Sequence, residues 1–330
     1  MEQIVRVIIP TYNRANLINE AILSVLNQTF QQFEIIIVDD GSNDNTEEIV
    51  LRFVEHDKRI KYLYQENQGA GSARNNGICQ DNAPKYVAFL DSDDTWYPDH
   101  LERAVNFLEM CPELLLVFAR MDIIDTIGQY TKEGGVQLHN RKLEAILQTA
   151  RKFHIPHAYI LDTLACKQAL IYDELTPRTS GTVVRKNMVS APLWFDPELI
   201  VLEDLDFFIR MSNSPFGFLD VICGTYRQFG DNLTALRDLK SSKMLKRQMS
   251  VLVFQQKKLN KTIKKEEHLM IQTKIADTAY LVGQCMSEQK EKRSTIVRMY
   301  IKSLRNKFSF MAMKSLVGLF VPEILKNYLR

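Results

Sequence analysis

Two carboxylates, Asp91 and Asp93, stand two residues apart directly after the apolar run Tyr86–Leu90. At the end of a buried strand, such a pair can point into one pocket and hold a hard divalent cation. Mg²⁺ or Mn²⁺ takes few protein carboxylates and completes its octahedron with phosphate oxygens of a substrate. The other use of this acidic segment is to cap the next helix, because Asp and Ser are common at helix starts. The spacing leaves both uses open.

A second acidic pair, Asp39 and Asp40, follows the apolar run Phe33–Val38 and precedes Gly41-Ser42. An Asp at a strand end can accept a hydrogen bond from the N–H of a nucleobase or from a ribose hydroxyl. A turn that leads into a helix N-cap is the alternative use of these residues.

A glycine-containing loop, residues 67–75, opens a predicted helix. The N-terminus of a helix favours phosphate, and Arg74 adds a positive charge there. Arg74 stands where a dinucleotide-binding fingerprint has its last glycine, so the loop gives little support to hydride transfer. The chain also contains no Gly-x-x-x-x-Gly-Lys-Ser/Thr loop.

Glu203 and Asp204 precede Leu205–Ser212, whose apolar spacing predicts a partly buried helix. Adjacent carboxylates at a helix start interact favourably with the helix dipole, which is one explanation for them. A carboxylate that is partly buried near other acids can also have its pKa raised enough to act as a general base. No Gly-x-Ser-x-Gly elbow offers a covalent nucleophile instead.

The elements that must position these residues alternate between strands and helices over the first hundred residues. Short runs rich in Val, Ile, Tyr and Phe predict the strands, and the segments between them have helical periodicity. This order predicts an α/β fold with a parallel sheet, in which ligands bind outside the carboxyl ends of the strands. The predicted strands are Val5–Pro10, Phe33–Val38, Ile60–Tyr64 and Tyr86–Leu90, and the predicted helices are Asn16–Asn27, Thr46–Glu55 and Gly71–Cys79.

The chain changes character near residue 234, so we expect two domains, residues 1–234 and 235–330. The first continues the α/β pattern, whereas the second consists of long helices with basic faces. The further predicted elements are strands at Leu114–Phe118 and Gly181–Arg185, and helices at Lys142–Lys152, Leu236–Leu259, Glu266–Met286 and Thr295–Asn306.

The composition is that of an ordinary folded protein, with 330 residues, 45% hydrophobic and 25% charged. The net charge of +2 is the sum of −12 for residues 1–234 and +14 for residues 235–330. Five cysteines without a Cys-x-x-Cys pair argue against a disulfide framework or a structural zinc site, and indicate a reducing cytoplasm. No run of about twenty apolar residues is free of charge, so we expect no transmembrane helix.

Several of these motifs occur together in the order and spacing of the family 2 glycosyltransferases. The chain resembles that family closely over residues 4–110, less closely over 177–234 and not beyond. The resemblance implies a GT-A fold, Rossmann-like with a mostly parallel sheet flanked by helices, to which this chain adds an α-helical C-terminal extension. It also implies a nucleotide-diphospho-sugar donor and inversion at the anomeric carbon. The motifs are Pro10-Thr11-Tyr12-Asn13-Arg14, Val38-Asp39-Asp40-Gly41-Ser42, Asn67 through Asn75, Phe89-Leu90-Asp91-Ser92-Asp93-Asp94 and Glu203-Asp204.

Carried over residue by residue, the resemblance implies that Asp39 reads the base, in this family often uracil, so that a UDP-sugar is the favoured donor. Asp91 and Asp93 match the family's Asp-x-Asp motif, which positions the ribose and a divalent metal, Mg²⁺ or Mn²⁺. Asp204 matches the acid that removes the proton of the acceptor hydroxyl. The nucleotide-sugar-binding residues that the resemblance implies are Pro10, Thr11, Tyr12, Asp39, Arg74, Asp91 and Ser92.

The chain departs from the family pattern at Phe229, where many relatives carry a metal-binding histidine after a Tyr-Arg pair. A catalytically weak nucleotide-sugar-binding protein is therefore the alternative to an enzyme. The Gln-x-x-Arg-Trp motif and the membrane spans of processive polysaccharide synthases are missing from the sequence, so we expect one sugar per event. The segment of residues 140–178 is longer than the corresponding segment of many compact relatives. It either determines which acceptor is used or forms a surface insertion.

The basic region contains an apolar stretch from Phe308 to Leu325, interrupted by Lys314, Pro322 and Glu323. This pattern suits an interfacial helix on anionic lipid, and a core-packing or dimer helix explains it as well. The region has no recognition motif for nucleic acid, so we expect no such partner. We expect a cytoplasmic enzyme, peripheral on the inner face of the membrane, that builds a surface polysaccharide or glycolipid on a glycan or lipid-linked acceptor.

Overall fold

The two central strands, β1 (Val5–Thr11) and β2 (Phe33–Asp39), are buried along their whole length. Continuous runs of Val and Ile, without polar alternation, are typical of parallel strands covered on both faces. Thr11 and Asp39 are register partners at the ends of the two strands. These two residues therefore begin the polar edge of the sheet.

The computed structural model describes residues 4–80, 84–132, 140–171, 175, 177–189, 194–199, 202–228, 251, 255 and 265–319. The chain divides into two compact units, Met1–Gln228 and Phe229–Arg330. The boundary that we predicted near residue 234 lies outside the described residues, as do the predicted helix Leu236–Leu259, apart from two isolated positions, and Phe229.

Four strands form the first half of the sheet in the order β3 (Ile60–Tyr64), β2, β1 and β4 (Tyr86–Phe89), all parallel. Helical crossovers connect them, which brings their carboxyl ends to one edge. The strands and helices predicted for this half are confirmed, with ends that shift by one or two residues. The connecting helices are α1 (Ile18–Leu26), α2 (Thr46–His56) and α3 (Ala70–Ile78).

The second half of the sheet is mixed. β10 (Thr182–Arg185) lies antiparallel between β4 and β6 (Leu116–Ile124), and β11 (Phe216–Arg227) lies parallel to β6. β6 and β11 therefore run in the direction of β1 to β4, so the prediction of a mostly parallel sheet is confirmed for the long strands. Short strands complete it: β5 (Thr95–Trp96) on β11, β7 (Tyr130–Lys132) on β6, and β9 (Ala158–Ile160) then β8 (Arg151–Lys152) beyond β11.

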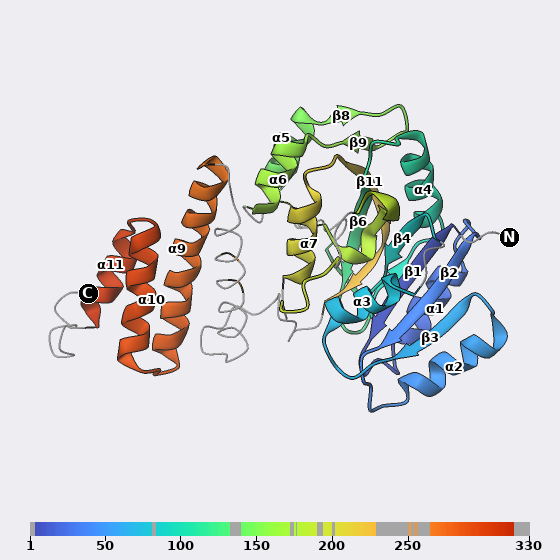
Figure 1. The fold of residues 1–330 in the computed structure, drawn as a ribbon, viewed down its shortest axis with the longest axis horizontal. Coiled ribbons are helices and arrows are strands. Elements are labelled where there is room, and N and C mark those ends of the chain that lie inside the picture. The colour runs from blue at the N-terminus through green and yellow to red at the C-terminus, as the bar shows by residue number, and fades with distance from the viewer. Residues whose placement is uncertain are drawn as a thin grey trace. The chain divides into compact units, whose positions relative to one another are not determined.

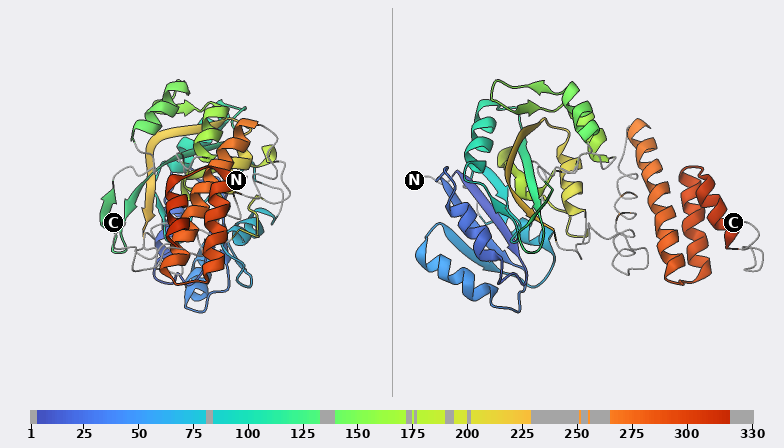
Figure 2. Two further views of the ribbon diagram at one scale, coloured as in Figure 1. Left: turned by 90° about the vertical axis from the view of Figure 1, so that its left-hand side faces the viewer. Right: turned by 180° about the vertical axis from the view of Figure 1, so that it is seen from behind.

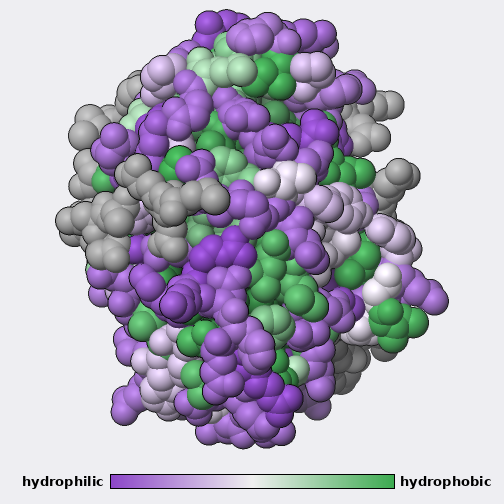
Figure 3. Space-filling view, turned by 90° about the vertical axis from the view of Figure 1, so that its right-hand side faces the viewer, coloured by the Kyte–Doolittle hydropathy of each residue, from purple (hydrophilic) through white to green (hydrophobic). Residues whose placement is uncertain are grey.

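Helices cover both faces of the sheet (Figures 1 and 2). α1 and α4 (His100–Met110) pack on one face, in a core cluster with Val7 and Ile9 of β1. The outer surface of this unit is mainly hydrophilic on the side drawn in Figure 3, with apolar side chains in small separate patches. The arrangement is the sheet flanked by helices that the family resemblance implies.

The opposite face of the sheet carries α3 and α7 (Glu203–Met211). Gly77 lets α3 approach β1 closely, because a Cβ atom there would lie 2.8 Å from Cγ2 of Ile8. The ring of Phe207 on α7 packs edge-on against Phe89 of β4, with centroids 6.3 Å apart. α3 thus packs on β1, and α7 packs on β4.

The segment 140–178 contributes two short strands, β8 and β9, to the sheet. β9 pairs with β11, so the segment extends the sheet edge, and α5 (Asn140–Thr149) and α6 (Thr163–Ile171) flank the new strands. The helix predicted at Lys142–Lys152 is wrong at its end. It stops at Thr149, because the last two residues pair with β9 as strand β8.

The second unit contains α9 (Lys265–Glu288), α10 (Arg293–Asn306) and α11 (Phe310–Gly318). Gly283 of α9 faces Tyr300 of α10 so closely that a Cβ atom would lie 2.6 Å from the ring. The two long helices confirm the predictions for Glu266–Met286 and Thr295–Asn306. Among the described residues, none of the helices combines the length and apolarity needed to span a membrane.

Candidate functional site

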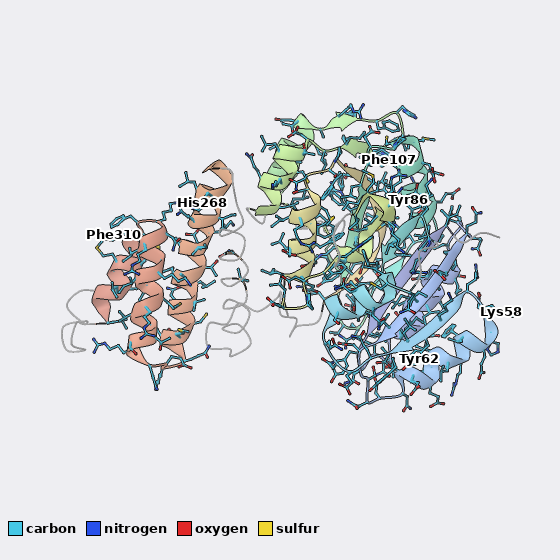
Figure 4. All side chains as sticks on the ribbon, in the orientation of Figure 1. Lys58, Tyr62, Tyr86, Phe107, His268 and Phe310 are labelled. Carbon is cyan, nitrogen blue, oxygen red and sulfur yellow. The ribbon has the colours of Figure 1, made fainter. Side chains whose placement is uncertain are left out.

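Asp39 lies buried at the end of β2, where it shapes the following turn. Its Oδ1 accepts the backbone N–H of Ser42 at 2.8 Å, and its Oδ2 accepts the hydroxyl of Tyr62 at 2.9 Å. Burial and this bond to Asp39 raise the pKa of Tyr62, which Figure 4 labels. Each carboxylate oxygen keeps a further lone pair. The turn that the sequence offered as an alternative use is therefore present.

Thr11 lies beside Asp39 in register and is buried, with 3% of its surface exposed. Its hydroxyl has no hydrogen-bond partner within the described structure. A buried polar atom without a partner is rare in native proteins, and a bound ligand is one explanation for it. Of its two neighbours in the predicted site, Pro10 is buried in β1 and Tyr12 is 44% exposed.

Asp40 was not predicted to have a role of its own, and the structure gives it one in the fold. Its two oxygens accept the side-chain amide of Gln65 and the backbone N–H groups of Gln68 and Gly69, each at 2.8 Å. Gly69 has φ +90°, which favours glycine, and immediately precedes α3. Asp40 thus fixes the loop that leads into α3, the helix that carries Arg74.

Arg74 is almost fully buried and binds two acids that lie far apart in the sequence. Its Nη2 donates to Oδ1 of Asp91 at 2.6 Å, and its Nη1 donates to Oε1 of Glu203 at 3.2 Å. Burial lowers the pKa of Arg74, but the charges of Asp91 and Glu203 outweigh it and raise the pKa above its ordinary value. Its Nε is buried and has no partner among the described residues.

The start of α7 places Glu203 and Asp204 next to the start of α3. A Cβ atom on Gly71 would lie 3.2 Å from Cγ of Glu203. Burial and the neighbouring charge of Asp204 raise the pKa of Glu203 to about 7, against the effect of Arg74. Oδ1 of the half-buried Asp204 accepts the N–H of Leu205 at 2.7 Å. Sequence patterns assign Glu203 no role separate from that of Asp204, and its position beside Asp204 is the signal that points to it.

The acidic loop after β4 presents Asp91 and Asp93 to solvent in part, with side chains that are 30% and 19% exposed. Nη2 of Arg14 lies 3.4 Å from Oδ2 of Asp93. Burial and the charge of Asp91 raise the pKa of Asp93, and Arg14 works in the opposite direction. Ser92 lies between them and is buried.

Asp94 links this loop to Ser180 and Arg227 through buried hydrogen bonds. Its Oδ2 accepts the hydroxyl of Ser180 at 2.5 Å, and its Oδ1 accepts the N–H of Arg227 at 3.0 Å. The Ser180 oxygen in turn accepts the N–H of Asp91 at 3.1 Å. Burial, followed by the charges of Asp93 and Asp91, raises the pKa of Asp94 well above its usual range. Asp94 is therefore held by the protein, and Asp91 and Asp93 are left to face outward.

Arg227, at the end of β11, is a second residue that sequence reasoning missed. Its side chain donates to the carbonyl oxygens of Asp93 and Thr126 at 3.4 and 3.3 Å and pairs with Glu20 of α1 at 2.8 Å. The acidic loop is thus tied to β11, to the turn after β6 and to α1. No local pattern could reveal this, because the partners lie 101 to 207 positions away in sequence.

The arrangement suits a divalent metal that is shared with a substrate. Asp91 and Asp93 are partly exposed carboxylates on one short loop, and Arg74 uses only one oxygen of Asp91. Within the described ranges, His, Cys, Asp and Glu form no group of three or more suited to a metal. Two carboxylates with substrate phosphates are what Mg²⁺ commonly uses, so the residues fit such an ion.

Sequence comparison gives one family assignment. The profile of "Glycosyl transferase family 2" matches residues 6–170, half of the chain. An uncharacterized glycosyltransferase of Haemophilus influenzae is 42% identical over 215 residues, which cover 58% of this chain and 85% of that protein. One of Rickettsia bellii is 38% identical over 173 residues, or 52% of this chain. The chain spans only 24% of that Rickettsia bellii protein and 17% of a Rickettsia conorii relative.

Solved structures show the same fold at low sequence identity. Staphylococcus aureus TarS 1–349 in complex with UDP-GlcNAc has a TM-score of 0.58 at 18% identity, with 96% of this chain and 92% of that one covered. The mannosyltransferase PcManGT of Pyrobaculum calidifontis, in complex with GDP-Man and Mn²⁺, has a TM-score of 0.55 at 15% identity, with 98% and 82% covered. At these identities the likeness concerns the fold.

Proposed function

The chain belongs to glycosyl transferase family 2 and has the GT-A fold, and from this premise we propose that it transfers one sugar from a nucleotide-diphospho-sugar to an acceptor hydroxyl with inversion. The observation that carries the proposal is the bridge made by Arg74. One guanidinium links Asp91, on the loop suited to a donor diphosphate, with Glu203, next to the proposed base Asp204. One buried side chain thus ties the proposed donor loop to the start of the helix that carries the proposed base.

The nucleoside of the donor binds at the ends of β1 and β2 in this proposal. Asp39 accepts the N–H of the base, and the hydroxyl of Thr11, which otherwise lacks a partner, bonds to the same nucleoside. Pro10 and Tyr12 line this pocket. A UDP-sugar is the favoured donor, and the structural likeness to a protein in complex with UDP-GlcNAc supports it.

Asp91 and Asp93 hold Mg²⁺ or Mn²⁺ in this proposal, with Ser92 between them at the donor. When bound, the ion neutralises the charge that develops on the leaving nucleotide diphosphate. The Mn²⁺ in the complex of PcManGT supports a divalent metal on this fold. The side chain of Arg14 and the buried Asp94 keep the two carboxylates in place.

Asp204 is the proposed general base. It takes the proton of the acceptor hydroxyl while that oxygen forms a bond to the anomeric carbon and the bond from this carbon to the diphosphate oxygen breaks. A single displacement of this kind inverts the anomeric configuration. Arg74 and Glu203 fix the start of α7, so that Asp204 keeps its position next to the donor.

The proposed setting is the cytoplasm, peripheral on the inner face of the membrane, with a glycan or lipid-linked acceptor of a cell-envelope polysaccharide. A Bacillus subtilis protein whose name assigns it provisionally to teichuronic acid biosynthesis is 43% identical over 106 residues, which supports this setting. The match covers 32% of this chain and 42% of that protein. We propose one sugar per event and no nucleic-acid partner.

The test is a panel of nucleotide sugars, first by thermal shift and then by release of nucleotide with and without EDTA. A ligand that binds only the native state raises the apparent stability, so the panel identifies the base and narrows the sugar. The enzyme should release nucleotide only when metal is present. Binding of a donor without turnover in either condition would instead identify a nucleotide-sugar-binding protein.

A further inference from the structure

The second unit carries an exposed apolar face, made of Phe308, Phe310, Met311 and Met313, which we name the α11 face. The exposed fractions of these side chains are 69%, 75%, 63% and 39%. Ala312, in the middle of the same segment, is fully buried and marks the side of α11 that packs inward. Figure 4 labels Phe310 on this helix.

The geometry of a helix explains the placement of the three members of this face that lie on α11. At about 100° per residue, Phe310 and Lys314 lie opposite Ala312, and Met311 and Met313 lie on either side of them. A stripe of two thioethers and an aromatic ring around one lysine is therefore turned to solvent. Large apolar side chains that cluster on a surface mark an interaction site more often than the same residues scattered singly.

The surroundings of the α11 face are strongly basic. Residues 290–319 contain eight Lys and Arg residues and one acidic residue, a net charge of +7. Arg305, Lys307 and Lys314 are exposed and form no ion pair among the described residues. A partner that covers this face must therefore supply negative charge around an apolar centre.

We infer that the α11 face docks on an anionic phospholipid surface. Its Phe and Met side chains enter the boundary between headgroups and acyl chains, and the flanking Arg and Lys side chains reach the lipid phosphates. The inference deepens the proposed peripheral location and rests on it, but it does not depend on the sugar-transfer chemistry.

Charge decides between lipid and a second copy of the chain. If two copies paired through this face, the basic side chains around it, including Arg305, Lys307 and Lys314, would meet the equally basic surface of the other copy, and like charges would oppose the contact. An anionic bilayer attracts each of these side chains, by about fivefold in affinity for each one near the surface. The lipid surface is therefore the occupant that satisfies both the apolar and the charged part of the face.

The test is flotation of the full chain with vesicles of phosphatidylglycerol and phosphatidylcholine, against vesicles of phosphatidylcholine alone. We expect binding to the anionic vesicles that weakens as salt is added. Phe310→Asp should weaken it by about tenfold or more, because an apolar ring is replaced by a charge that anionic lipid repels. The double variant Lys307→Glu and Lys314→Glu should weaken binding to the anionic vesicles more than Phe310→Asp does.

Matched controls come from the first unit. Met110→Asp replaces a side chain that is 55% exposed on α4, and Lys58→Glu reverses an exposed charge, and both should bind vesicles like the wild type. Circular dichroism verifies that the helices of each variant remain. Phe310 is 75% exposed, so its replacement should leave the fold intact.

Three results would overturn the inference: wild-type protein that ignores anionic vesicles, equal binding to both kinds of vesicle, or Phe310→Asp that binds like the wild type. Self-association that Phe310→Asp abolishes, without vesicle binding, would assign the face to a second copy. Donor binding is measured on the same samples by thermal shift. If a variant loses vesicle binding but keeps donor binding, the change affects the α11 face alone, and the proposed sugar transfer is not contradicted.

Discussion

The guanidinium of Arg74 lies 2.6 Å from the carboxylate of Asp91, in a position where only 4% of the arginine side chain is exposed. Its other amino group reaches Glu203, so a single buried cation joins the loop after β4 to the start of α7. Glu203 depends on this cation most, because a largely buried charge without a partner is strongly unfavourable, whereas the side chain of Asp91 is 30% exposed. The geometry of the site therefore depends on Arg74 before any substrate binds.

Replacing Arg74 should destabilise the protein through the acids that it leaves behind. Arg74→Met is expected to lower the free energy of unfolding by about 3 kcal/mol, measured by urea denaturation. Adding Glu203→Gln should restore part of this loss, since one unpaired carboxylate is removed. The control is Arg52→Met. Because the ion pair of Arg52 with Glu48 is exposed, its loss should lower the free energy of unfolding by less than about 0.5 kcal/mol. Equal losses in the two single variants would contradict the role of Arg74.

Glu203 should make stability depend on pH. Its pKa is about 7 in the folded protein and lies above the ordinary glutamate value, so the folded state binds the proton more tightly than the unfolded state does. Stability from this group should therefore fall as pH rises from about 4.5 to 7, by at most about 1.4 kcal/mol per pH unit.

Comparison with Glu203→Gln isolates this effect from that of Asp93 and Asp94, whose pKa values are raised as well. We expect the difference in free energy of unfolding between variant and wild type to grow in favour of the variant across this pH range. A difference that stays constant, or that changes in the opposite direction, would show that Glu203 does not titrate as described.

Thr11→Val separates fold from ligand binding. The Thr11 hydroxyl is buried without a partner, so the substitution should leave the free energy of unfolding unchanged or raise it by about 1 kcal/mol. Donor binding should weaken by about fivefold, the value of one hydrogen bond. Thr182→Val is the control, because the Thr182 hydroxyl donates to the carbonyl of Arg178 at 2.8 Å and its loss should destabilise. Unchanged donor affinity in Thr11→Val would remove Thr11 from the donor site.

Asp93→Ala tests the metal. The variant should bind the donor more weakly than the wild type when Mn²⁺ is present, because one of the two proposed metal ligands is lost. In EDTA the two proteins should bind the donor equally. Calorimetric titration measures both conditions, and a wild-type affinity of the variant in Mn²⁺ would count against metal binding by Asp93.

The sequence predicts the parallel half of the fold well, because its information is local there. The runs Val5–Pro10 and Phe33–Val38 are uniformly apolar, and the structure buries both strands fully. β11 escaped prediction for a physical reason. Its pairing with β6 shifts register between Leu219 and Ile222 and again before Thr225, which destroys the alternation that marks a strand.

Part of the candidate site could be predicted from sequence, namely Arg74, Asp91 and Asp93, which the structure brings to one edge of the sheet. Asp91 and Asp93 follow a strand directly, so their place on the polar edge follows from the order of elements. That Asp40 holds the loop at Gln68 could not be foreseen, because Asp39 and Asp40 adjoin at the end of the same strand and only the packed loop decides which acid it uses. Arg227 acts through partners that only the complete sheet brings together.

The most direct test of the central claim is release of nucleotide by the wild type and by Asp204→Asn, with the donor found in the panel, an acceptor and Mn²⁺. The proposal predicts that donor affinity is nearly unchanged in the variant, while turnover falls by about two to four orders of magnitude, as loss of a general base requires. Turnover by Asp204→Asn at the wild-type rate would contradict sugar transfer with Asp204 as the base.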